Sequence, residues 1–129
     1  MINILMSRSS ALNQAWAYDE LKQILKPKMK VVVLGFSFFN ELTEEEYFSI
    51  YDKGTEYYEK IANNFLEYGI RDINWIYYYK TDHDEMVERI NNADILYFPG
   101  GAPDLMMKRI IEKNILEELK AFKGIVIGS

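Results

Sequence analysis

The sequence contains no cysteine, and this absence removes several kinds of chemistry at once. Without thiols the chain has no disulfide framework, no thiolate metal site and no cysteine nucleophile. It also lacks any apolar run of about 18 residues, so no transmembrane helix is expected. Its first residues, "MINILMSRSS", lack the basic start of a signal peptide. These features favour a cytoplasmic protein with no membrane partner.

The sequence also lacks clusters of basic residues and has only one histidine. The net charge is −5 and the Lys and Arg residues are dispersed, so a nucleic-acid partner is not expected. The single histidine, His83, stands in "TDHDEM" among acidic residues, a composition that suits the first turn of a helix because of the helix dipole. We therefore predict no metal site and no cofactor.

The pattern along the 129 residues is one of short β-branched runs alternating with longer amphipathic segments. Such alternation is typical of a parallel sheet with helices on both faces. The length suits one domain, so we predict a single α/β domain over 1–129, a three-layer, doubly wound and mostly parallel sheet. The expected strands are 2–7, 30–36, 72–79, 94–98 and 124–128.

Helix boundaries are marked by capping residues and glycines. Thr43 and Glu46 have the spacing of a capping box, so a helix is predicted to begin near residue 44. Gly54 is expected to interrupt that helix, and Gly69 is expected to end the one that follows. The remaining expected markers are Ser9, Ser10 and Pro27 for a helix over 11–25, Thr81 or Asp82 for a helix after the third strand, and Pro103 and a break near Asn114 for the last helical stretch.

Ligands of open parallel sheets bind at the carboxyl ends of the strands, so the residues that follow each strand are the candidates for a site. Most of them are expected to be ordinary turn residues. The residues at this edge are Ser7, Arg8, Ser37, Phe38, Asn40, Lys80, Thr81, Asp82, those of 99–103, and Ser129.

The segment "YFPGGAPD" is the exception among these turns. Pro99, Gly100, Gly101 and Pro103 fall between a predicted buried strand and a predicted helix. The glycines allow a tight turn and expose backbone N–H groups, as in an anion site or half of an oxyanion hole. A plain tight turn is the alternative, because the segment matches neither a P-loop nor G-x-G-x-x-G. Gly100 and Gly101 are the candidate site residues.

The strand and glycine loop "ILYFPGGAPDLM", the helix after them and the strand "GIVIGS" together resemble peptidase family S51, which includes dipeptidase E and cyanophycinase. The opening "LMSRSS" is similar to the start of that family. The resemblance implies the class I glutamine-amidotransferase-like, flavodoxin-like fold. It also implies that the chain is truncated relative to the family and covers the amino-terminal part of a longer S51-like domain.

The resemblance further implies a serine peptidase that hydrolyses small peptides by Ser–His acyl transfer. In the family the last strand runs into a Gly-x-Ser-Ala-Gly turn, in which Gly128 matches the first glycine and Ser129 the variable residue. The nucleophile is therefore expected directly after Ser129 and the general-base histidine later still, so neither Ser129 nor His83 takes these roles. Gly100 or Gly101 would supply one oxyanion N–H. The 129-residue chain alone is expected to be inactive.

Two other functions remain open from the sequence. A class I glutamine amidotransferase would carry cysteine where S51 carries serine, and a non-catalytic binding module on a flavodoxin-like fold would need neither. The many aromatic residues are expected to pack in the core, with a substrate-stacking surface as the alternative. We also expect "GIVIG" to be an open apolar edge that favours association, which leaves a homo-oligomer open.

Overall fold

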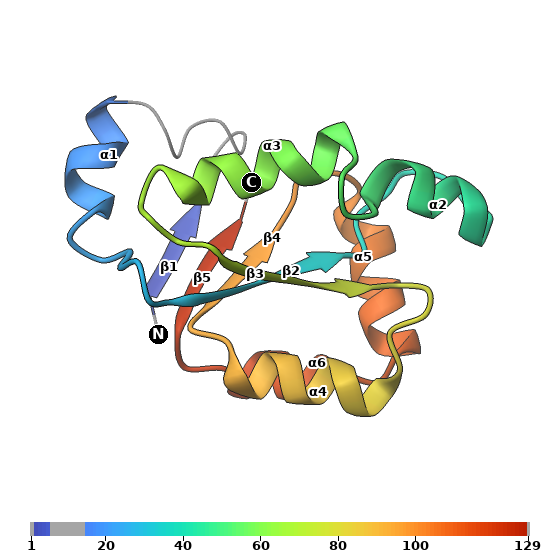
Figure 1. Cartoon of the computed structure of the whole chain (residues 1–129). Coiled ribbons are helices and arrows are strands. Elements are labelled where there is room, and N and C mark those ends of the chain that lie inside the picture. Colours follow the sequence, from blue (N-terminus) through green and yellow to red (C-terminus); the bar gives the residue numbers. More distant parts are fainter. Residues whose placement is uncertain (1, 6–14, 129) are drawn as a thin grey trace.

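The structure, a computed structural model, describes residues 2–5 and 15–128. Its centre is a five-stranded sheet in the order β1-β5-β4-β2-β3 (Figure 1). Every neighbouring pair of strands is parallel, which confirms the predicted α/β fold. The strands are β1 (Ile2–Leu5), β2 (Lys30–Gly35), β3 (Asp72–Tyr77), β4 (Ile95–Phe98) and β5 (Ile125–Gly128).

Helices cover both faces of the sheet and complete three layers (Figure 1). They are α1 (Ala15–Leu21), α2 (Glu44–Tyr51), α3 (Glu56–Leu66), α4 (His83–Asn92), α5 (Pro103–Glu112) and α6 (Leu116–Ala121). Successive side chains of a strand point to opposite faces. Val31 and Val33 therefore pack with α3, whereas Val32 and Leu34 pack with α4 and α5. Both faces of β2 are buried, which suits its unbroken run of apolar residues.

Local capping fixes most helix boundaries as the sequence predicted. The Thr43 hydroxyl accepts from the Glu46 N–H at 3.2 Å while the Glu46 carboxylate accepts from the Thr43 N–H at 3.0 Å, a complete capping box. Gly54 has a φ of +93° and separates α2 from α3. Asp82 caps α4 by accepting from the Glu85 N–H at 2.8 Å.

Gly69 ends α3, as predicted, in a left-handed conformation with a φ of +77°. The Ile70 N–H donates to Phe65 O and the Gly69 N–H donates to Leu66 O, which is the Schellman arrangement. Asn114, with a φ of 57°, breaks the last helical stretch into α5 and α6, also as predicted.

Two predicted elements are shorter than expected. The third strand ends at Tyr77 because the Tyr77 N–H donates to Thr81 Oγ1 at 3.1 Å, which turns the chain away from the sheet. The first helix ends at Leu21, well before residue 25. Its predicted start and its caps Ser9 and Ser10 lie outside the described residues, as does the predicted end of the first strand.

The expectation that "GIVIG" forms an open edge is wrong. β5 lies between β1 and β4, with Gly128 opposite both Leu5 and Phe98. The pairing of the first strand with the last joins residues more than a hundred positions apart, which no local pattern reports. The edges of the sheet are β1 and β3.

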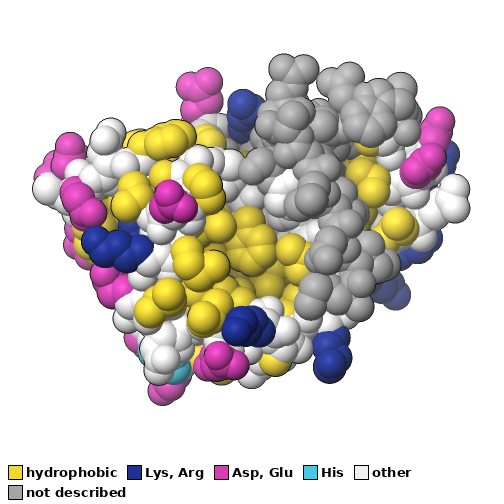
Figure 2. Space-filling model, turned by 180° about the vertical axis from the view of Figure 1, so that it is seen from behind, with side chains coloured by type: hydrophobic (Ala, Val, Ile, Leu, Met, Phe, Trp, Pro, Cys, Tyr) yellow, Lys and Arg dark blue, Asp and Glu magenta, His cyan; other side chains and the backbone are white. Residues whose placement is uncertain are grey.

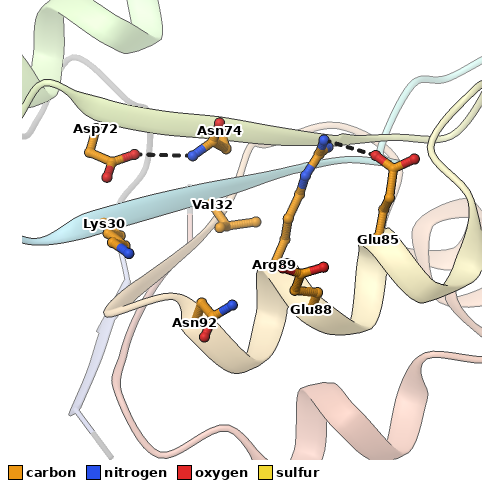
Figure 3. Close-up of a pocket in the computed structure, with 8 residues that line it drawn as sticks. All are labelled: Lys30, Val32, Asp72, Asn74, Glu85, Glu88, Arg89 and Asn92. Atoms are coloured by element: carbon orange, nitrogen blue, oxygen red, sulfur yellow. Dashed lines mark hydrogen bonds and ion pairs between the residues drawn. The ribbon is translucent and has the colours of Figure 1, made fainter.

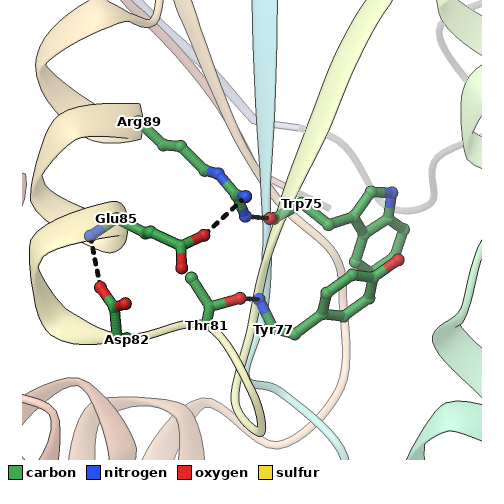
Figure 4. Close-up of polar contacts among 6 residues, drawn as sticks. All are labelled: Trp75, Tyr77, Thr81, Asp82, Glu85 and Arg89. Atoms are coloured by element: carbon green, nitrogen blue, oxygen red, sulfur yellow. Dashed lines mark hydrogen bonds and ion pairs between the residues drawn. The ribbon is translucent and has the colours of Figure 1, made fainter.

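The edge strand β3 is closed to further pairing along part of its length (Figure 4). Arg89 of α4 donates to Trp75 O and is itself held by Glu85, with 3.1 Å between Arg89 Nη2 and Glu85 Oε2. Thr81 occupies the Tyr77 N–H. A second strand would have to displace these bonds, and such devices protect sheet edges from association.

Apolar side chains gather on the side of the molecule opposite to the view of Figure 1 (Figure 2). Helix α5 exposes Met107 and Ile111, and Val126 of the interior strand β5 is only partly buried.

Within the described part of the chain, the helices are all too short or too polar to cross a lipid bilayer.

Tyr47 ties helix α2 to two strands, and its hydroxyl is predicted to contribute strongly to stability. It donates to Gly35 O at 2.6 Å and accepts from the Tyr78 N–H at 2.9 Å. Tyr47→Phe leaves both groups unpaired, so we expect the free energy of unfolding in urea to fall by about 2–4 kcal/mol.

The matched control for that change is Tyr58→Phe. The Tyr58 ring stacks on Trp75, and its hydroxyl bonds to none of the described residues. Its removal should change the free energy of unfolding by less than about 0.5 kcal/mol. Equal losses in the two variants would contradict a specific role for the Tyr47 hydroxyl.

Candidate functional site

The glycine loop of residues 99–102 lies at the carboxyl edge of the sheet, beside the end of β5. Phe98, the last residue of β4, pairs with Gly128, the last residue of β5. Pro99 therefore begins where both strands end, which confirms the predicted placement of the loop. Pro103 occupies the first turn of α5, also as predicted.

Ser37, which follows β2, holds this loop through both its hydroxyl and its backbone carbonyl. Its hydroxyl donates to Pro99 O at 2.9 Å and lies 3.3 Å from Gly100 O. Its carbonyl accepts from the Ala102 N–H at 2.8 Å. Ser37 is only 7 % exposed, so these bonds are shielded from water. The turn after β2 and the loop after β4 therefore form one unit.

Gly101 is the point of closest approach between the loop and this turn. A Cβ atom on Gly101 would lie 2.1 Å from Ser37 O, a distance at which atoms overlap. Only glycine allows the two backbones to meet here. Among the described residues, the Gly101 N–H has no hydrogen-bond acceptor, so it can serve a ligand.

The side chain of Arg109, on α5, reaches the turn after β2. Its Nη1 donates to Phe36 O at 2.8 Å and to Phe38 O at 2.6 Å, and its guanidinium lies 3.5 Å from the centre of the Phe38 ring. Arg109 is 4 % exposed. Its charge is thus satisfied by backbone carbonyls and an aromatic face.

Sequence reasoning missed the roles of Ser37 and Arg109. Ser37 was recognised only as one of several residues at the carboxyl edge. A signal for Arg109 was present in the helical spacing, because Arg109 follows Met106 by three positions and adjoins Ile110 on the buried side of α5. An arginine in an apolar stripe needs a partner, and that requirement could have singled it out.

His83 lies on the helix that follows the edge strand β3 and not in the loop beside the end of β5. It begins α4, which follows the edge strand β3, and two strands separate β3 from β5. Three strand spacings amount to about 14 Å. Its Nε2–H donates to Asn114 O at 3.0 Å. That His83 is not the general base stays a prediction.

The other predicted edge residues have structural roles or lie outside the described part. Thr81 accepts from the backbone N–H of Tyr77 at the end of β3, and Asp82 accepts from the backbone N–H of Glu85 in the first turn of α4. The carbonyl of Asn40 lies 3.5 Å from Arg109 Nη2. Ser7, Arg8 and Ser129 are outside the described residues.

The aromatic residues near the loop pack mainly on one another. Phe38 contacts the rings of Tyr47 and Tyr78, with centroids 5.2 Å and 5.7 Å apart. A hydrogen bond to Glu112, together with burial, raises the pKa of Tyr78 to about 12. Burial also raises the pKa of Tyr47. Both tyrosines are thus neutral at physiological pH, which makes them packing groups rather than bases.

A polar groove of about 310 Å³ lies between α4 and the strands β2 and β3 (Figure 3). Lys30 and Asp72 are the first residues of their strands, so the groove extends toward the amino edge of the sheet, away from the glycine loop. Two pairs of its side chains bond to each other, Asn74 to Asp72 at 3.0 Å and Arg89 to Glu85 at 3.1 Å. No cluster of three metal-ligating side chains occurs among the described residues.

Comparison with known proteins gives a likeness of fold. Residues covering 98 % of this chain superpose on a protein of Listeria monocytogenes EGD-e named "Putative Peptidase E Protein", with a TM-score of 0.67 and 17 % sequence identity. The match spans only 57 % of that protein's length. No protein-family model matches the sequence, and no curated protein matches it either. The chain therefore has a peptidase E-like, flavodoxin-like α/β fold.

Proposed function

We propose that this chain belongs to a cytoplasmic serine peptidase of the S51 type that hydrolyses small peptides. The observation that carries the proposal is the meeting of the glycine loop with the end of β5, where Phe98 pairs with Gly128. One segment supplies a backbone N–H for an oxyanion, and the other leads into the position expected for the nucleophile. The likeness to the peptidase E fold supports the same assignment.

In this proposal the chain supplies the amino-terminal part of a longer S51-like domain. The serine expected after Ser129 attacks the peptide carbonyl, and a histidine further along removes its proton. Negative charge then develops on the carbonyl oxygen. The N–H of Gly101 donates to that oxygen together with the N–H that follows the serine. The residues described here bind the developing charge and carry out none of the proton transfers.

The test begins with the coding sequence that follows Ser129. We expect Ser-Ala-Gly directly after it and a histidine further on. The full-length protein should hydrolyse dipeptides, and exchange of that serine for alanine should abolish hydrolysis while the circular dichroism spectrum stays unchanged. An alanine variant as active as the wild type would refute the serine mechanism.

Two outcomes would point to the other functions. A cysteine at the nucleophile position, with glutamine hydrolysis in place of peptide hydrolysis, would indicate a glutamine amidotransferase. A residue with no nucleophilic side chain would indicate a non-catalytic binding module.

A further inference from the structure

We infer that Ser37 is a positioning residue that aims the Gly101 N–H, and that Arg109 holds Ser37 in place. The catalytic meaning of this inference rests on the proposed peptidase function. The aiming itself is a property of the described residues. In this inference, neither the Ser37 nor the Arg109 side chain contacts the substrate.

The direction of the Gly101 N–H follows from the bonds that Ser37 makes. The carbonyl oxygens of Pro99 and Gly100 both lie within hydrogen-bond distance of the Ser37 hydroxyl, at 2.9 Å and 3.3 Å, and share its one proton. The described peptide bonds are all trans, and in a trans peptide the C=O and the next N–H point in opposite directions. The Gly101 N–H therefore points away from Ser37. The glycine loop follows β4, which lies between β2 and β5 in the sheet. An N–H that points away from the turn after β2 therefore points toward the end of β5.

Arg109 fixes the residue that does the aiming. It binds the carbonyls on both sides of Ser37, those of Phe36 and Phe38, 73 and 71 positions away in sequence. Arg109 lies on α5, the helix that follows the glycine loop. The loop is therefore connected to the turn after β2 in two ways, by its own bonds with Ser37 and through α5 and Arg109. Charge-assisted hydrogen bonds of this kind are the strong ones, and a buried guanidinium cannot give them up without a large loss.

Such rigidity matters for an oxyanion donor. A backbone N–H stabilises developing charge most when it is oriented before the reaction, because no reorganisation is then needed. Pro99–Gly100–Gly101 would otherwise be a flexible segment, since glycine populates many backbone conformations. The Ser37 hydroxyl selects one of them.

The aiming can be measured in the 129-residue chain by residual dipolar couplings, which report the direction of an N–H bond. We expect Ser37→Ala to change the coupling of Gly101 while the couplings of Phe98 and Ile127 stay the same. Ser37→Thr, which keeps the hydroxyl, should preserve the Gly101 coupling. Arg109→Lys should change it as Ser37→Ala does, although residue 109 bonds to neither glycine.

The consequence for the reaction is measured in the full-length peptidase. Ser37→Ala should lower kcat by about 5–10-fold with KM unchanged, the loss expected when one hydrogen bond that orients a donor is removed. Ser37→Thr should restore kcat. A residue that served stability alone would lower the melting temperature without this separation of kcat from KM.

The inference is overturned if the Gly101 coupling in Ser37→Ala equals that of the wild type. It is also overturned if Ala and Thr change the coupling equally, since shape and not the hydroxyl would then be responsible. If Ser37→Thr does not fold, the Gly101 coupling of Arg109→Lys is compared with that of the wild type instead. An unchanged coupling then overturns the inference. A full-length protein that hydrolyses no peptide would refute the proposed function, while the couplings would still decide the role of Ser37.

Discussion

If the proposed peptidase function is right, replacing the Gly101 amide by an ester is expected to lower the turnover of the full-length protein by roughly 10²–10³-fold. The exchange installs glycolic acid at position 101 and removes the N–H while adding no atom to the side chain. A proline would not serve, because its Cβ would lie near the same point, 2.1 Å from Ser37 O, and would disrupt the turn as well. Steady-state kinetics on a dipeptide substrate measure the effect.

The control for the ester is the same exchange at Gly100. Each ester also weakens a carbonyl that accepts from Ser37. The ester at position 101 weakens the Gly100 carbonyl, and the ester at position 100 weakens the Pro99 carbonyl. A much larger loss at Gly101 identifies its N–H as the oxyanion donor. Losses of equal size would show that the weakened Ser37 bonds are responsible, and turnover unchanged by both would show that this loop is only a turn.

Gly101→Ala is expected to lower the free energy of unfolding of the 129-residue chain by about 3 kcal/mol or more. The new methyl group would overlap the backbone carbonyl of Ser37, and a carbonyl cannot rotate aside as a side chain can. Overpacking against well-ordered atoms typically destabilises by about 1–3 kcal/mol, and this contact is closer than most. Urea denaturation measures the change.

Gly54→Ala is the matched control for this substitution. Gly54 has a φ of +93°, so alanine is strained there, but nothing lies within 4 Å of its added Cβ. We expect a loss of about 1–2 kcal/mol, the strain of a left-handed residue alone. If Gly101→Ala destabilises no more than Gly54→Ala, the close approach to Ser37 is not a constraint.

Features that depend on neighbouring residues could be read directly from the sequence. Several helix boundaries occur as predicted: the capping box at Thr43 and Glu46, the helix ends marked by Gly54 and Gly69, and the break at Asn114. Each depends on hydrogen bonds or backbone conformations within a few residues, so the local sequence contains the needed information. The same holds for the strand–helix alternation that predicted a parallel sheet.

The placement of the glycine loop was also accessible, by one further step. Parallel strands share a carboxyl edge, so the loop after the fourth strand and the end of the fifth had to lie on the same side. That these two strands are also direct neighbours is a fact of the fold, given by the pairing of Phe98 with Gly128.

By itself, the sequence determined which segments become strands and helices, where most of the helices begin or end, and that a glycine loop lies at the carboxyl edge of the sheet, because short-range hydrogen bonding and periodicity decide these features. Only the tertiary structure decided that β1 pairs with β5, which makes the last strand interior, and that Arg109 and Ser37 secure the glycine loop. These contacts join residues about 60 or more positions apart. They depend on how whole elements pack, and no local pattern of residues specifies that packing.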